Sequence, residues 1–318
     1  MGRMLRWLGG ALVLVAVLGG LAVWQARRIH EAPGPLAAPV NHLVPRGGAE
    51  MIAASLARAG IIADSRAFAI AAWATRPQGA LRAGEFAFPA GASLAEVLAV
   101  LREARPVQRR LTIPEGLTAA QIVDLLERAE GLTGAMPPLA EGAILPETYA
   151  YQWGDTRAAV LRRAKAAMDA ALAEAWDQRA EGLPLATPRE ALILASIVEE
   201  ETGRPEERPR VAAVFLNRLR RNMPLQSDPT VAYAVSAGVG LDRALSRADL
   251  GRDSPFNTYR VRGLPPAPIA APGRESLRAV TRPAQTEELY FVADGSGGHA
   301  FARTLDEHNR NVARWRAR

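Results

Sequence analysis

Three consecutive carboxylates, Glu199, Glu200 and Glu201, are the side chains of this sequence best suited to acid–base chemistry. They follow a segment, residues 191–198, that is almost wholly apolar. A carboxyl group held against an apolar surface has a raised pKa, because burial disfavours its charged form, and a carboxyl that stays protonated can act as a general acid. The structural alternative is a solvated acidic helix end, and this stretch alone leaves both readings open.

The flanking residues predict that the three acids end a helix. Thr187 and Glu190 have the spacing of a T-x-x-E capping box, and a proline occupies the first helical position between them. At about 100° per residue, Glu201 continues the most apolar stripe of this helix, Glu200 lies at its edge and Glu199 lies on the opposite side. The pattern therefore favours Glu201 as the general acid.

The composition indicates a globular protein without a thiol or metal site. With 318 residues, of which 49% are hydrophobic and 23% charged, the chain can form one large or two moderate domains. The absence of cysteine excludes disulfides, Cys-ligated zinc and thiol catalysis. The four histidines are scattered and form no H-x-H or H-x-x-x-H pair, so we expect neither a metal nor another cofactor.

The net charge of +6 suits a polyanionic partner, such as nucleic acid, anionic lipid headgroups or an acidic cell-wall polymer. No dense run of Lys and Arg is interleaved with aromatic residues. Nucleic acid is therefore not favoured among these partners.

An uncharged apolar run, residues 8–24, is flanked by Arg3 and Arg6 before it and by Arg27 and Arg28 after it. No small-x-small cleavage site follows the run, so it predicts a single-pass membrane anchor rather than a cleaved signal peptide. The N-terminal amino group adds positive charge to the first flank, which favours a cytoplasmic N-terminus. The body of the protein would then lie outside the cytoplasm.

Strand and helix signals alternate in small units after the anchor, which predicts an α+β fold. We divide the chain into a tail and anchor (1–28), a Pro/Ala-rich tether (29–39), a small α+β module (40–106) and a larger, helix-rich domain (107–318). The larger domain also contains a long Pro/Gly-rich loop region, residues 257–273, which we expect to form a wall of a binding cleft.

Several ordered sequence blocks resemble the YceG-like family of endolytic murein transglycosylases. They include E-G-A-I-L-P-E-T-Y (141–149), A-S-I-V-E-E-E-T (195–202), V-F-L-N-R-L (214–219), L-Q-S-D-P-T-V (225–231), G-L-P-P (263–266) and Y-F-V-A-D-G (290–295). The blocks cover residues 140–310 densely. Glu147 departs from the usual Asp of the first block, and Ala267 and Ala271 replace a usual Gly and Asn.

The resemblance implies an inner-membrane anchor, a small LysM-like module and a periplasmic catalytic domain. The family cleaves MurNAc–GlcNAc bonds within nascent peptidoglycan strands and leaves 1,6-anhydro-MurNAc ends, which would set glycan strand length. It also implies peptidoglycan synthases and divisome proteins as partners. The competing hypothesis is a non-enzymatic peptidoglycan-binding scaffold for the cell-wall synthesis machinery.

A lytic transglycosylase needs one carboxyl that acts first as acid and then as base. In other lytic transglycosylases the catalytic Glu precedes a Ser, and here Glu201 precedes Thr202, so the resemblance also favours Glu201. Glu199 is the second candidate. We expect six polar side chains to bind substrate in the cleft: Gln226, Ser227, Asp228, Asn257, Tyr259 and Glu147.

Overall fold

The computed structural model describes the backbone of residues 2–317 and the side chains of residues 12–317. The side chains of Arg3 and Arg6, used above to orient the anchor, lie outside the described residues. The chain divides into two compact units. The first contains residues 1–109 with 152–154, and the second contains residues 110–151 with 155–318.

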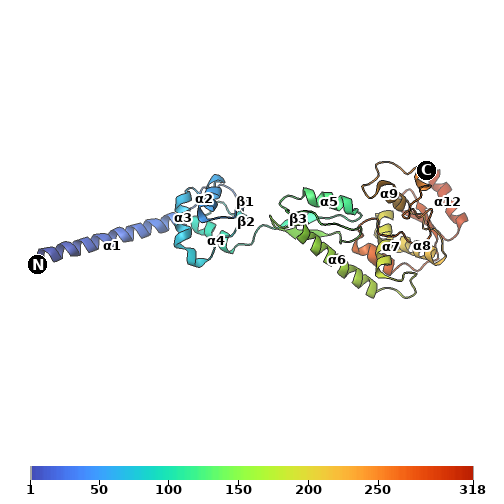
Figure 1. The fold of residues 1–318 in the computed structure, drawn as a ribbon, viewed down its shortest axis with the longest axis horizontal. Helices are drawn as coiled ribbons and strands as arrows, with labels where there is room; N and C mark the ends of the chain where they lie inside the picture. Colours follow the sequence, from blue (N-terminus) through green and yellow to red (C-terminus); the bar gives the residue numbers. More distant parts are fainter. Residues whose placement is uncertain (1, 318) are drawn as a thin grey trace. The chain divides into compact units, whose positions relative to one another are not determined.

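The first unit begins with a long helix, α1 (Gly2–Glu31), drawn in blue in Figure 1. Its segment Leu12–Glu31 is 20 residues long with a mean hydropathy of 1.5, enough in length and composition to cross a membrane. The helix runs three residues past the predicted end of the anchor at residue 28, because no helix breaker occurs before Pro33. From Leu12 onward its side chains are largely exposed.

A two-stranded antiparallel sheet and three helices complete the first unit. In chain order these elements are β1 (Val40–Val44), α2 (Ala49–Arg58), α3 (Ser65–Ala74), the short 3-10 helix η1 (Arg76–Gln78), β2 (Gly84–Phe88) and α4 (Leu94–Glu103). Val40 lies opposite Phe88 in the sheet, and Val44 lies opposite Gly84. The helices pack on the sheet through a core that includes Phe68, Phe86 and Leu101. The predicted order of strands and helices is thus observed.

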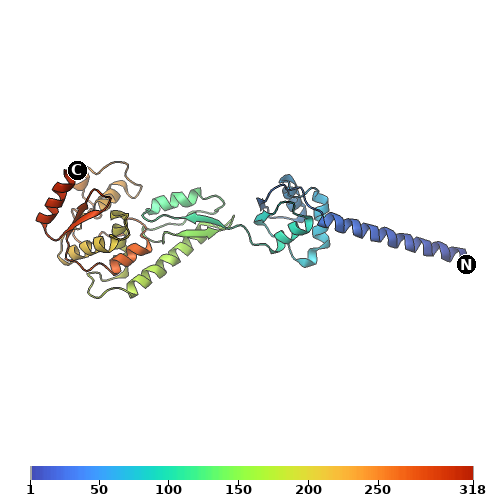
Figure 2. The same cartoon turned by 180° about the vertical axis from the view of Figure 1, so that it is seen from behind.

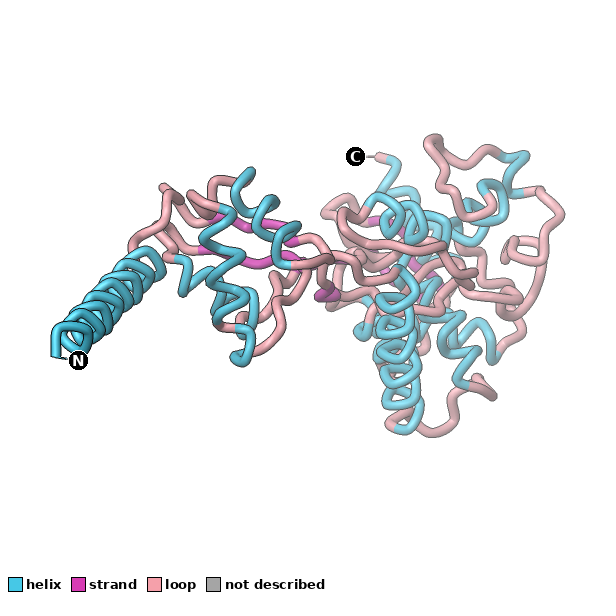
Figure 3. Tube along the Cα trace, turned by 60° about the vertical axis from the view of Figure 1, so that its left-hand side comes forward, coloured by secondary structure: helices cyan, strands magenta, loops and turns pink. Residues whose placement is uncertain are grey.

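The second unit is mostly helical, with two further two-stranded sheets at its edges. It contains β3 (Arg109–Thr112, whose first residue belongs to the first unit), α5 (Ala119–Arg128), β4 (Thr148–Tyr151), α6 (Arg157–Asp177), α7 (Pro188–Glu201), α8 (Arg208–Arg220), α9 (Asp228–Ser236), α10 (Arg247–Leu250), α11 (Arg274–Thr281), β5 (Tyr290–Ala293), β6 (His299–Ala302) and α12 (Leu305–Arg316). Figure 2 shows these elements from behind, and Figure 3 separates helices from strands by colour. The α+β class predicted from the sequence is confirmed.

The sequence analysis did not identify β4, which pairs with β3. Its residues alternate between exposed and buried, with Tyr149 and Tyr151 facing the core. The signal was therefore present, but only four residues long. Short alternating runs are ambiguous until a partner strand is known.

Helix α7 lies in the core of the second unit and packs against α6, α8 and α11. Ile197 and Val198 are completely buried, as are Val211 of α8 and Val280 of α11. The prediction of a buried core helix is confirmed. Its end, where the three carboxylates lie, is therefore held on a rigid support.

Candidate functional site

The three glutamates at the end of α7 have three different environments. The helix starts at the predicted cap, with the Thr187 hydroxyl accepting a hydrogen bond from the Glu190 backbone N–H (3.2 Å). The other half of the predicted capping box does not form, because the Glu190 carboxylate accepts from the backbone N–H of Ala186 (2.5 Å) instead. At its other end Glu199 is buried, Glu200 is exposed and Glu201 is half-buried. Each can therefore be assigned a separate role from its contacts.

Glu199, the second candidate acid, is occupied by structural hydrogen bonds. Its Oε1 accepts a hydrogen bond from Arg208 Nη2 (2.8 Å), and its Oε2 accepts one from the backbone N–H of Gly273 (2.8 Å). Burial raises the pKa of Glu199, while these hydrogen bonds and the charge of Arg208 oppose the rise. Arg208 also reaches Glu115 at 3.2 Å. Glu199 thus links α7 to α8 and to the start of α11.

Glu201, the first candidate acid, has the electrostatics of a general acid. Burial raises its pKa from 4.5 to about 7, and the nearby charges of Asp228 and Glu200 act in the same direction. The Ser227 side chain and the charge of Arg218 act against the rise. A carboxyl with a pKa near neutrality can both give up and take back a proton at physiological pH.

Glu200 shares this raised pKa and was not singled out by the sequence analysis. Although the residue as a whole is exposed, desolvation of its carboxyl by the surrounding groups, followed by the charge of Glu199, raises the pKa of Glu200 to about 7. Its Oε1 lies so close to Gly116 that a Cβ on that residue would be only 2.5 Å away. Gly116 has φ +80°, a conformation that also favours glycine. The loop that surrounds Glu200 comes from far earlier in the chain, so helix periodicity could not reveal this contact.

A pocket of about 760 Å³ lies beside the end of α7. Its polar lining includes Glu115, Thr118, Gln121, Glu200, Asp228 and Arg243. Tyr233 of α9 also lines the pocket and donates a hydrogen bond to Glu141 (3.3 Å), a residue of the first family-like block. The lining of the pocket is therefore mixed, with carboxylates and hydrogen-bond donors among apolar side chains such as Leu117, Leu245 and Ile269.

Three of the predicted substrate-binding residues surround Glu201. Asp228 lines the pocket, and its Oδ1 accepts a hydrogen bond from the Tyr259 hydroxyl (2.6 Å). Burial and this contact with Asp228 raise the pKa of Tyr259 well above its usual range, so its hydroxyl is a stable donor. The Oγ of Ser227 is buried and no described atom is in hydrogen-bonding geometry with it, but its side chain lies close enough to Glu201 to lower the pKa of that carboxyl. A buried hydroxyl in this position is available to a bound ligand.

Gln226 adopts a left-handed backbone conformation with φ 51°, unusual for a residue other than glycine. Its side-chain oxygen accepts a hydrogen bond from Arg218 Nη1 (3.3 Å), and its backbone N–H donates to the carbonyl of Thr258 (3.1 Å). Arg218 also donates to the carbonyl of Leu225 (2.7 Å). Gln226 therefore turns the chain so that the following Ser227 and Asp228 meet the end of α7.

Asn257 and Glu147 lie in different settings. The buried Asn257 amide donates to the carbonyls of Leu250 (3.1 Å) and Arg252 (2.8 Å), and its oxygen accepts from the Tyr259 N–H (3.0 Å). Its polar atoms thus shape the loop that carries Tyr259. Glu147 forms an ion pair with Arg274 (2.8 Å) and does not line the pocket described above.

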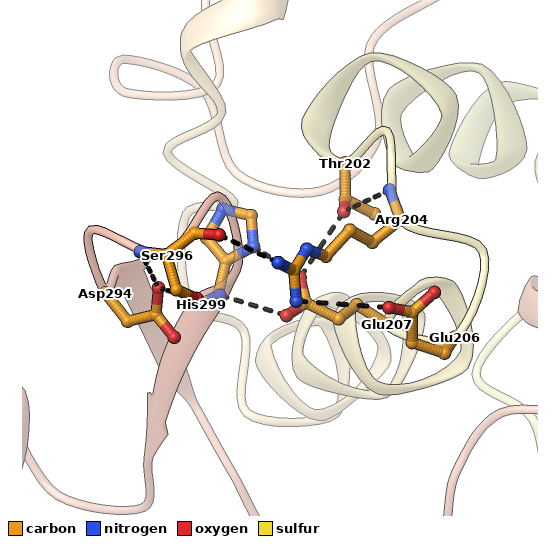
Figure 4. A network of polar contacts seen from close by, with 7 residues as sticks. All are labelled: Thr202, Arg204, Glu206, Glu207, Asp294, Ser296 and His299. Carbon is orange, nitrogen blue, oxygen red and sulfur yellow. Dashed lines mark hydrogen bonds and ion pairs between the residues drawn. The ribbon is translucent and has the colours of Figure 1, made fainter.

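The segment that follows Glu201 is tied to the β5–β6 hairpin by a polar network, shown in Figure 4. Glu207 accepts a hydrogen bond from the backbone N–H of His299 (3.0 Å) and contacts its ring Nδ1 (2.7 Å). Arg204 donates to the carbonyl of Ser296 (2.8 Å), and Thr202 donates to Glu207 (3.4 Å). Burial opposes ionisation of Glu207, but the hydrogen bonds from His299 prevail and lower its pKa.

No group of three or more His, Asp or Glu side chains in the described part of the chain is arranged to hold a metal ion.

Comparisons with known proteins identify relatives of this chain. Over 170 residues the chain is 39% identical to an endolytic murein transglycosylase of Bacillus subtilis (strain 168), covering 54% of this chain and 46% of that protein. Over 250 residues it is 30% identical to an endolytic murein transglycosylase of Streptococcus pneumoniae serotype 2 (strain D39 / NCTC 7466), covering 65% and 45%. The matched region thus spans less than half the length of these curated relatives.

A crystal structure of a yceG-like protein from Listeria monocytogenes has a similar fold, with a TM-score of 0.54 and 26% sequence identity. The similarity covers 86% of this chain and 99% of that one. The sequence model of the YceG-like family matches residues 43–314, which include both compact units. This chain therefore belongs to the YceG-like family, as the ordered sequence blocks predicted.

Proposed function

We propose that this protein is a peptidoglycan lytic transglycosylase that cleaves MurNAc–GlcNAc bonds within glycan strands, with Glu201 as its catalytic residue. The observation that supports this most is the half-buried Glu201 carboxyl, whose pKa is about 7, beside Ser227 and Asp228. The curated relatives are named endolytic murein transglycosylases, which agrees with this chemistry.

In the proposed reaction, protonated Glu201 gives its proton to the glycosidic oxygen while the bond from that oxygen to C1 of MurNAc breaks. The Glu201 carboxylate then accepts the proton of the muramyl 6-hydroxyl as O6 forms a bond to C1. The products are a GlcNAc end with a free hydroxyl and a 1,6-anhydro-MurNAc end. No water is consumed, and Glu201 finishes protonated, ready for another turnover.

The neighbours of Glu201 would stabilise the positive charge that develops on the sugar ring. The negative charge of Asp228 is suitably close, and the unpartnered Ser227 hydroxyl can bind a substrate oxygen. Tyr259 keeps Asp228 oriented through its 2.6 Å hydrogen bond. Gln226 and Asn257 would position Ser227, Asp228 and Tyr259 by shaping the loops that carry them. Glu147 would contact the glycan strand at a greater distance from Glu201.

Glu200 is the competing assignment for the acid, because it has a similar pKa and lines the open pocket. The discriminating experiment compares Glu199→Gln, Glu200→Gln and Glu201→Gln on uncrosslinked glycan strands, with anhydro ends counted by mass spectrometry. We expect Glu201→Gln to lose at least 10²–10⁴-fold in rate, roughly the contribution of general acid–base catalysis. Glu200→Gln should retain most activity.

Full activity in Glu201→Gln would overturn this assignment. Loss in Glu200→Gln would then assign the acid to Glu200, and loss in a stably folded Glu199→Gln would assign it to Glu199. Wild-type protein that releases no anhydro ends at all would favour a non-enzymatic peptidoglycan-binding scaffold.

We further propose that α1 is a single-pass inner-membrane anchor with a cytoplasmic N-terminus and a periplasmic catalytic domain. Its apolar segment Leu12–Glu31 and the Arg27 and Arg28 that follow the apolar core support an anchor. An alkaline phosphatase fusion at the C-terminus tests the topology, since it is active only outside the cytoplasm. An inactive but stable fusion would contradict the proposed orientation.

The first unit would serve as a LysM-like module for binding glycan, since β1 and β2 flank the helices α2 and α3 in a β-α-α-β order. An anchored enzyme that cuts nascent strands would set glycan strand length and work beside peptidoglycan synthases and divisome proteins. Binding of the isolated partners to the full chain would test these associations.

A further inference from the structure

Helix α3 presents an apolar face to solvent. Ile70 and Trp73 are each 67% exposed, whereas Phe68 and Ala72 on the other face are buried in the core. The two exposed side chains lie one turn apart, so they form a continuous surface. Large exposed apolar side chains that cluster in this way indicate an interaction site.

A groove of about 440 Å³ connects this face to the end of α1. Its lining is almost entirely apolar and includes Val23 and Ile29 of α1, Ile70 and Ala74 of α3, and Leu94 at the start of α4. Figures 1 and 2 both show α3 beside the end of α1. The apolar face of α3 is thus continuous with the apolar surface of α1.

The shared groove indicates how far Ile70 lies from the membrane if α1 is an anchor. Val23 belongs to the apolar run of α1, and Trp24 ends it. Because Val23, Arg27 and Ile70 line the same groove, Ile70 lies close to the point where the apolar run of α1 ends. An anchor that crosses a bilayer would therefore bring Ile70 and Trp73 to the membrane surface, where tryptophan is favoured.

The net charge of the segment around the apolar face is positive. Residues 64–84 contain Arg66, Arg76 and Arg82 and one acid, Asp64, whose carboxylate caps the start of α3. The guanidinium of Arg76 lies 4.5 Å from the ring centre of Trp73, so it stands at the edge of the apolar face. Arginines that border an apolar surface suit the negative headgroups of anionic phospholipids.

We propose that the α3 face formed by Ile70 and Trp73 binds the surface of an anionic phospholipid bilayer, next to the point where α1 leaves it. Two contacts then hold the first unit against the membrane: α1 spans the bilayer, and the α3 face binds its surface. This inference rests on the proposed function of α1 as an anchor. It adds a membrane-binding surface to a module otherwise expected to bind glycan.

The test uses the full chain, which has no natural cysteine, so a single introduced cysteine can be labelled selectively. Ile70→Cys carries a fluorophore, and Leu43→Cys is the matched control. Leu43 is an exposed apolar residue (40%) on β1 that takes no part in the groove. Both proteins are reconstituted in phosphatidylethanolamine/phosphatidylglycerol vesicles that contain a lipid with a nitroxide at headgroup depth. Resistance to alkaline extraction reports separately whether α1 is inserted.

We expect quenching by the nitroxide lipid to be several-fold stronger at residue 70 than at residue 43, in protein that resists extraction. Weak and equal quenching at both positions in such protein would overturn the membrane contact and leave α1 as an anchor. Protein that is extracted would overturn both proposals. Shielding of residue 70 from water without lipid quenching would indicate a second copy of the chain on this face, and would also overturn the proposal.

A second measurement tests the charged residues. Replacing phosphatidylglycerol with phosphatidylcholine, or introducing Arg66→Gln and Arg76→Gln together, should weaken quenching at residue 70. Both arginines are exposed, so the double variant should keep its melting temperature. Quenching that stays unchanged in both experiments would overturn the preference for anionic lipid.

Discussion

Removal of the Glu199 carboxylate should destabilise the second unit rather than abolish the chemistry directly. The side chains of Glu199 and Arg208 are only 4% and 9% exposed and form an ion pair of 2.8 Å. Glu199→Ala leaves the Arg208 charge buried with only Glu115 as a partner and leaves the Gly273 N–H without its acceptor. Breaking a buried pair from one side typically costs about 3–5 kcal/mol of folding free energy.

The expected effect on thermal stability follows from the size of the unit. For a domain of about 150–250 residues, 1 kcal/mol corresponds to roughly 2–4 °C, so the melting temperature should fall by roughly 6–20 °C. Differential scanning calorimetry of the full chain measures this change. The matched control is Glu200→Ala, one residue along the same helix but exposed, which should change the melting temperature by only a few degrees.

A double-mutant cycle separates the pair from its surroundings. Arg208→Leu removes the buried charge, so the Glu199→Ala/Arg208→Leu protein should be more stable than the sum of the two single changes predicts. A Glu199→Ala protein that melts like the wild type would refute the structural role argued for this residue. If that stable protein were also inactive, Glu199 would have to be reconsidered as the acid.

Four further predictions concern pH, charge and the β5–β6 hairpin. The rate constant kcat/KM should fall about tenfold per pH unit above about pH 7, because the Glu201 acid must start protonated; a profile that is flat to pH 9 would argue against Glu201 and Glu200 alike. The raised pKa of Glu201 stabilises the folded protein below pH 4.5, and this contribution is lost as pH rises through about 7, so Glu201→Gln should raise the melting temperature most at pH 8. Asp228→Asn removes a negative charge that raises the pKa of Glu201, and the alkaline limb of the pH–rate profile should move to lower pH, whereas a shift to higher pH would contradict the electrostatics. Glu207→Gln should weaken the hydrogen bonds to His299 and lower the free energy of unfolding, measured by chemical denaturation, by about 1.5–3 kcal/mol. Glu206→Gln, at an exposed neighbouring residue, is the control and should leave that free energy unchanged.

Much of the fold followed from local sequence signals. The capping residue Thr187 and the apolar body predicted α7 and its burial. The choice of Glu201 by periodicity stays a prediction, since Glu199 is the more buried of the two. The ordered blocks predicted the family, and the apolar N-terminal run predicted a long apolar helix. These features depend on residues close together in the chain, so composition and spacing are sufficient to read them.

The roles of the other two glutamates depended on the tertiary structure. Glu199 is bound by Gly273, 74 residues later, and by Arg208 of the next helix. Glu200 meets Gly116 from a loop more than eighty residues earlier.

The sequence by itself therefore determined the helix, its three carboxylates and the family to which the chain belongs. Only the tertiary structure decided which carboxylate is paired, which is exposed and which is half-buried with a pKa near 7. The physical reason is that pKa and hydrogen bonding depend on desolvation and on charges within a few ångströms, whatever their separation along the chain.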